Sequence, residues 1–196
     1  MRPGCLRIAF ALVLGALAAV PAAAQTLEWV YAVPFVCGYQ PPITSGGEPV
    51  VKPGNYATEI DVHNPHYVDV DVRKKFILLV DNGNPVGREP NSRGPQAFDG
   101  ILLGPDFATM DDCLRIWQLT HPGIVPPTPM PLNKGYVVFL SKEEIDVDVI
   151  YTSVVPGNNA TAALTGNAID VERIKGKQVV VPLTATPRTD RPEGQR

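Results

Sequence analysis

The first alternating stretch of the chain is Thr26–Cys37, where apolar and polar residues take turns as in a strand with one buried face. Its predicted core face carries Trp29, Tyr31, Val33, Phe35 and Cys37. Pro34 falls on the other face. Because proline cannot donate to a hydrogen-bonded ladder, we expect an edge strand or a bulge there. Gly38–Gly54 is rich in Pro, Gly and Ser, which predicts a loop.

Two more alternating stretches, Asn55–His63 and Val68–Val80, follow the loop and are separated by the turn signal Asn64-Pro65-His66. We predict that they form a hairpin-like pair over Tyr56–Val80. The same alternation would point Lys74 into the core. A bulge near Arg73–Lys75, or an edge position, is expected to relieve that conflict.

The middle of the chain is less regular. Asp81–Phe98 is predicted to be a long polar loop. Asp111–Leu119 is predicted to be a strand that carries Cys113 and Trp117 on one face. The proline-rich part of His121–Lys134 predicts an extended, polyproline-like surface segment, which is typical of a rigid connector and also suits docking to an aromatic groove.

The last part again predicts strands. Gly135–Leu140 is a continuous apolar run that suits a central strand, and it is predicted to form a hairpin with the alternating Ile145–Tyr151. Two short strands are predicted over Ala168–Ile174 and Gln178–Leu183, with Gly176 in the turn between them. The final strand either closes a sheet of its own domain, which we favour, or offers an edge to a partner.

These elements predict an all-β fold, a single immunoglobulin-like antiparallel β-sandwich. Short strands with turn signals between them, and no sustained helical period, are typical of that class. The 21 prolines of the chain also disfavour long helices.

The first 24 residues have the pattern of a secretory signal peptide. Arg2 and Arg7 supply the positive charge, Ile8–Val20 is apolar, and Pro21–Ala24 ends in small residues. We therefore predict a signal peptide over 1–24, a β-sandwich domain over 25–184 and a disordered tail over 185–196. The expected localisation is secreted or periplasmic, without a membrane span.

Removal of residues 1–24 from 196 leaves 172, and the loss of Arg2 and Arg7 changes the formal net charge from −3 to −5. An acidic chain without a basic stripe disfavours nucleic-acid binding. Cys5 also leaves, so Cys37 and Cys113 remain as an even pair in an oxidising compartment. We expect them to form a structural disulfide that closes a loop of about 75 residues.

Candidate chemistry is sparse. His63, His66 and Asp61 are candidates for a surface metal site, but metal sites need three or four ligands in fixed geometry, and solvated turn histidines are the simpler interpretation. The acid pairs Asp69/Asp71 and Asp146/Asp148 suit an ordinary wet sheet face. The chain has no nucleophile motif, phosphate-binding loop or dinucleotide fingerprint, so we expect no enzymatic activity and no cofactor.

Several segments occur in a familiar order. They are Val33–Gly38, Gly54–Pro65, Arg73–Lys75, Asp112–Cys113, Gly135–Val138 and Ile145–Thr152. In this order, over Val33–Thr152, the chain resembles a family of small exported bacterial β-sandwich proteins with a two-cysteine pair and no known activity. The resemblance implies a fold and an exported setting, and it carries over no catalytic residue.

Three hypotheses of function follow. The first is an exported structural or protein-interaction module, whose partner is an envelope or extracellular protein or another copy of the chain. The second is a periplasmic metal or small-ligand binding protein that uses surface His and Asp side chains. The third is a small secreted hydrolase, which would need a pocket of converging titratable groups.

Overall fold

A computed structural model describes residues 25–42, 49–154 and 167–182 of the chain. The predicted signal peptide and the predicted tail lie outside these ranges. The described elements are β1 (Gln25–Gln40), β2 (Gly54–His63), β3 (Val70–Asp81), β4 (Asn84–Pro85), β5 (Ala97–Leu103), β6 (Ala108–Asp112), α1 (Cys113–Thr120), β7 (Asn133–Ser141), β8 (Asp146–Val154), β9 (Asn167–Arg173) and β10 (Lys177–Pro182). The predicted all-β class is confirmed, while the immunoglobulin-like arrangement stays a prediction.

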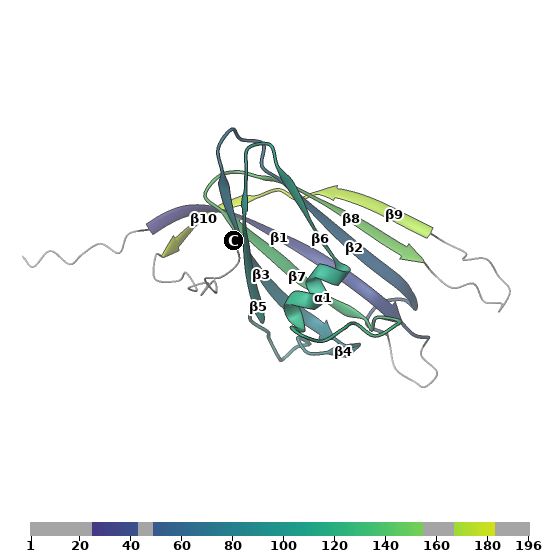
Figure 1. Cartoon of the computed structure of the whole chain (residues 1–196). Helices are drawn as coiled ribbons and strands as arrows, with labels where there is room; N and C mark the ends of the chain where they lie inside the picture. Colours follow the sequence, from purple (N-terminus) through teal and green to yellow (C-terminus); the bar gives the residue numbers. More distant parts are fainter. Residues whose placement is uncertain (1–24, 43–48, 155–166, 183–196) are drawn as a thin grey trace, which may run out of the picture.

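The 10 described strands are connected in one antiparallel arrangement, which divides at β1 into two parts that we call sheet A and sheet B (Figure 1). In sheet A, β3 lies between β7 and the short strands β4 and β5, and β1 lies between β7 and β10. In sheet B, β2 lies between β6 and β8, and β9 pairs with the other edge of β8. The last residues of β1, Gly38–Gln40, pair with β2 and so connect the two sheets.

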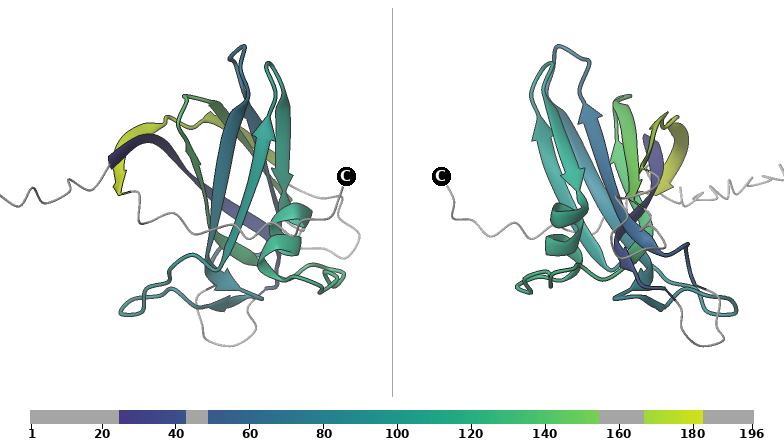
Figure 2. Two further views of the ribbon diagram at one scale, coloured as in Figure 1. Left: turned by 60° about the vertical axis from the view of Figure 1, so that its left-hand side comes forward. Right: turned by 90° about the vertical axis from the view of Figure 1, so that its right-hand side faces the viewer.

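One hydrophobic core lies between the sheets. The predicted core face of β1 is confirmed: Tyr31, Val33, Phe35 and Cys37 are buried, and Trp29 packs against them. Inward side chains of β3 and β7 join these from sheet A, and side chains of β2 and β8 join them from sheet B. Helix α1 lies on the side of the molecule away from the β1–β10 ribbon (Figure 2).

Of the two alternatives predicted at Pro34, the structure shows an edge rather than a bulge, and this edge is local to the middle of β1. Among the described strands, β1 pairs only with β7 between Tyr31 and Cys37. Side chains of sheet B satisfy part of this open edge. Thr58 Oγ1 accepts from Val36 N and donates to Val36 O, both at 3.0 Å, and the Tyr151 hydroxyl donates to Pro34 O at 3.0 Å. Burial, with nearby acidic charge as a smaller cause, raises the pKa of Tyr151 to about 12, so this hydroxyl stays a donor.

The predicted hairpins are wrong. β2 and β3 lie in different sheets, and so do β7 and β8. The chain passes from one sheet to the other just after Asn64. The Asn64 side chain stabilises this connection, since its amide nitrogen donates to the carbonyls of Val68, Leu103 and Gly104. β9 and β10 are also divided between the sheets, and Gly176 lies in their crossover, where a Cβ atom would come within 2.6 Å of the Tyr31 ring.

The strand predicted over Asp111–Leu119 is also wrong. β6 ends at Asp112, and α1 begins at Cys113. Asp112 caps the helix, since its Oδ1 accepts from Arg115 N at 2.7 Å. Ile116 and Trp117 are the buried residues of the helix. An acid followed by core residues at helical spacing is the signal that indicates this element.

Lys74 does point into the core, and the predicted bulge near Arg73–Lys75 is wrong. At this position β3 is paired on both sides, with β5 and with β7, and its register shift lies instead between Leu78 and Val80. Lys74 and Asp111 are 3% and 1% exposed. Lys74 Nζ lies 2.9 Å from Asp111 Oδ1 and 2.7 Å from Oδ2. A buried ion pair therefore joins β3 of sheet A to β6 of sheet B.

Cys37 and Cys113 are brought together as expected. Their sulfur atoms lie 2.03 Å apart and their Cα atoms 5.5 Å apart. The bond ties the end of β1 to the first residue of α1. Within the described ranges, no helix has both the length and the apolar character needed to cross a membrane.

Candidate functional site

The feature that most needs a functional explanation is the outer face of sheet A, which we call face A. Its side chains alternate with those of the core. The strand register places Phe98, Lys75, Val138 and Ala32 in one row across β5, β3, β7 and β1. The next row contains Ile77, Tyr136 and Pro34. Face A is therefore mostly apolar on four neighbouring strands.

An antiparallel sheet that covers a core normally turns polar side chains to water. Face A does so only in part, because apolar side chains gather at its centre. Phe98 and Tyr136 remain 46% and 40% exposed, Ala32 and Pro34 are also exposed, and Ile77 and Val138 are partly exposed. Single exposed apolar side chains are ordinary, whereas a contiguous apolar patch marks an interaction surface.

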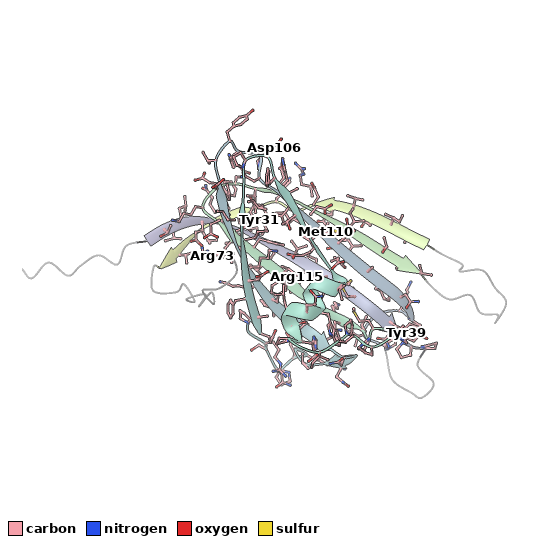
Figure 3. The ribbon with its side chains drawn as sticks, in the orientation of Figure 1. Tyr31, Tyr39, Arg73, Asp106, Met110 and Arg115 are labelled. Atoms are coloured by element: carbon pink, nitrogen blue, oxygen red, sulfur yellow. A yellow bond between two sulfur atoms is a disulfide. The ribbon has the colours of Figure 1, made fainter. Side chains whose placement is uncertain are left out.

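Charged side chains border this patch. Arg73 of β3 forms an ion pair with Glu28 of β1, across the intervening strand β7 (Figure 3 labels Arg73). The pair is largely withdrawn from solvent, since Glu28 is buried. A shallow hollow beside Arg73 is lined by Asp71, Leu102, Lys142 and Glu143, among others. Both acidic and basic side chains line this hollow. It lies at the rim of the patch, where it suits a polar side chain of a partner.

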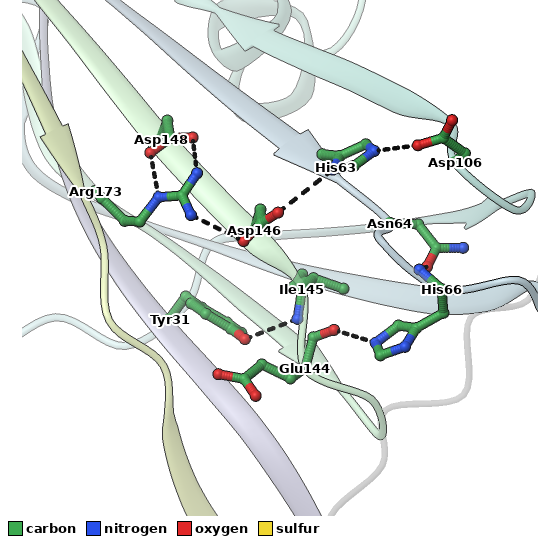
Figure 4. Close-up of polar contacts among 10 residues, drawn as sticks. All are labelled: Tyr31, His63, Asn64, His66, Asp106, Glu144, Ile145, Asp146, Asp148 and Arg173. Carbon is green, nitrogen blue, oxygen red and sulfur yellow. Dashed lines mark hydrogen bonds and ion pairs between the residues drawn. The ribbon is translucent and has the colours of Figure 1, made fainter.

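A second polar cluster lies around His63, at the end of β2 (Figure 4). His63 Nε2 lies 2.9 Å from Asp106 Oδ1, and His63 Nδ1 lies 3.4 Å from Asp146 Oδ2. Arg173 of β9 binds Asp146 and Asp148 of β8 at 2.9 to 3.1 Å. These contacts connect β2, β8, β9 and the loop before β6.

The three metal candidates are not gathered into one site. His63 faces two carboxylates, and His66 Nε2 donates to the Glu144 carbonyl at 2.6 Å. Asp61 lies two residues before His63 on the same face of β2. Across residues 25–42, 49–154 and 167–182, no group of three or more His, Cys, Asp or Glu side chains is arranged to hold a metal ion.

We expect the contribution of His63 to stability to depend on pH. The hydrogen bond to Asp106 raises the pKa of His63, partial burial opposes this, and Asp146 adds a smaller increase. Because the pKa of His63 is raised in the folded state, protonated His63 stabilises the fold. This stabilisation is complete below the unfolded-state pKa of about 6.5 and is lost as the pH rises through the folded-state pKa. The melting temperature of wild type should therefore exceed that of His63→Gln at about pH 6 and converge with it at about pH 9.

His66→Gln is the matched control, because His66 contacts a carbonyl rather than a carboxylate. A difference between wild type and His63→Gln that stays constant over this pH range would contradict the assignment.

The sequence does not indicate several of these residues. Phe98 falls at the end of the predicted loop Asp81–Phe98, and Tyr136 and Val138 lie in the predicted strand Gly135–Leu140, whose neighbours on the outer face the sequence does not give. The useful signal was the continuous apolar run Gly135–Leu140, since a strand with one wet face would alternate. Asp106 and Arg173 reach the His63 cluster from distant parts of the chain, so no local pattern could connect them.

Comparison with known proteins adds little to this description. No family model matches the chain, and no curated protein matches it. Among solved structures, the chain is similar to the crystal structure of Thermotoga maritima 1070. The sequence identity is 8%, the TM-score is 0.37, and the match covers 76% of this chain and 93% of that chain.

Proposed function

We propose that this protein is an exported structural or protein-interaction module, secreted or periplasmic and without catalytic activity, that binds a partner through face A. The observation that carries the proposal is the group of exposed and partly exposed apolar side chains on four neighbouring strands of sheet A, Phe98, Ile77, Tyr136, Val138, Ala32 and Pro34, which surrounds Lys75. Burial of such a surface against a partner is favourable, roughly in proportion to the apolar area removed from water.

The Cys37–Cys113 pair supports the exported setting, because disulfides persist in oxidising compartments. The rigid sheet beneath face A supports a binding role. Its strands are fixed by ladders on both sides of β3 and β7, so the surface is preorganised for docking.

We expect a photo-crosslinking amino acid at Tyr136 to form a discrete adduct in the native cell envelope or its medium. The same amino acid at Val125, an 85% exposed loop position, serves as the control. The adduct should disappear when Phe98→Glu is added, because a charge on the same patch would oppose docking. Equal yields at positions 136 and 125, or no effect of Phe98→Glu, would overturn the proposal.

The metal-binding alternative stays a prediction. Metal analysis of the purified protein, with and without chelator, tests it directly. Stoichiometric metal together with a chelator-induced fall in melting temperature would support that alternative over a purely structural role.

A further inference from the structure

The outer face of sheet B, which we call face B, differs in character from face A. Acidic side chains gather on it from three strands: Glu59 and Asp61 from β2, Asp112 from β6, and Asp148 from β8. Arg173 is the basic residue among them, and it is already bound to Asp146 and Asp148. Face B is therefore acidic in balance.

Face B also carries apolar side chains. Met110 of β6 lies opposite Asp61 in the ladder and is 49% exposed (Figure 3). Ile150 of β8 lies opposite Val171 of β9, and Val171 is 63% exposed. Acidic and apolar side chains thus share one sheet surface.

Face A has the complementary charge. Lys75 lies within its apolar row, and Lys134 and Lys177 project from β7 and β10 on the same side. Arg73 is neutralised by Glu28, and Asp71 lies at the border of the patch. The positive charges available to a partner on this face are therefore lysines set beside apolar side chains.

We propose that face A of one copy binds face B of a second copy, in a head-to-tail association of this chain with itself. This inference rests on the proposed function and names its partner. Packing face A on a second face A would bring lysines together, and packing face B on face B would bring acids together. Only the unlike pair places lysines against carboxylates, and interfaces select such complementary potentials.

The size of the surface sets the strength of the association. Seven residues at about 3.3 Å and four strands at about 4.8 Å give a face of roughly 23 Å by 19 Å. Two such faces bury roughly 900 Å² in total, which is below the size of stable specific interfaces and in the range of weak, transient ones. The contact is therefore weak and concentration-dependent. Because the two faces differ, a dimer leaves one face A and one face B unoccupied. Further copies bind these faces until the assembly closes into a ring or grows into a filament.

Two single variants and their mixture test the proposal by sedimentation velocity over a wide concentration series. Lys75→Glu disables face A and leaves face B intact, while Asp61→Lys does the reverse. The expected result is that wild type associates more strongly at low salt than at high salt and that each variant alone stays monomeric. An equimolar mixture should associate again, because the intact face A of Asp61→Lys binds the intact face B of Lys75→Glu.

Lys52→Glu and Glu89→Lys are controls that make the same charge changes at exposed loop positions, and both should associate like wild type. Circular dichroism of every variant should match wild type. The proposal is overturned if wild type is monomeric throughout, or if Asp61→Lys still associates alone, which would indicate an interface of face A with itself. A position-136 adduct with a different protein, in the absence of self-association, would sink this inference and leave the proposed function standing.

Discussion

Replacing Lys74 with methionine should lower the free energy of unfolding by about 3–5 kcal/mol, because Asp111 would keep a buried charge without its partner. At roughly 2–4 °C per kcal/mol for a domain of this size, the loss is a large fall in melting temperature. Chemical denaturation at neutral pH measures the change. Asp111→Leu alone should cost a similar amount for the converse reason.

The double variant Lys74→Met/Asp111→Leu provides the decisive comparison. When both charges are replaced by apolar groups, stability should return to the wild-type value or rise by about 1–4 kcal/mol. Arg115→Met is the matched control, since Arg115 forms a partly exposed pair with Asp99 and should cost less than about 1 kcal/mol. Additive losses in the double variant would contradict this account of the pair.

Reduction of the Cys37–Cys113 bond should cost about 2–5 kcal/mol of unfolding free energy. The two cysteines are 76 residues apart in sequence, so the bond removes much of the freedom of the unfolded chain. It also anchors the start of α1 to β1. Urea unfolding with and without reductant measures the effect.

The Cys37→Ser/Cys113→Ser variant controls for other actions of the reductant. It should be destabilised without reductant and unchanged by its addition. If wild type unfolds at the same urea concentration in both conditions, the bond does not stabilise the fold as we expect.

The sequence was most informative where one strand has one buried face. The core faces of β1 and β2 follow directly from residue type, because alternation tells which side chains point inward. The existence of β7 follows from its continuous apolar run. Alternation does not tell which strand lies alongside. β2 and β3 alternate well and are close in sequence, and β7 and β8 are also close in sequence, yet each pair is divided between the two sheets.

Lys74 shows a second limit. A lysine at an inward position conflicts with the pattern only until its partner is known, and Asp111 is 37 residues away on another strand. The helix α1 shows a third, since eight residues offer little more than two turns of periodicity. For face A the apolar residues were visible in the sequence, but their neighbours depend on the register of four strands.

The two ends of the described chain meet in one ladder, where Thr26 of β1 pairs with Val181 of β10. Such long-range pairing slows folding, because the chain loses conformational entropy in bringing distant segments together before their contacts stabilise it. A chain that emerges with its N-terminus first therefore carries β1 without β7 until Ser141 has been delivered, and without β10 until Pro182 has been delivered. The ladder that joins β1 to β10 therefore forms late, after the other described strands are present.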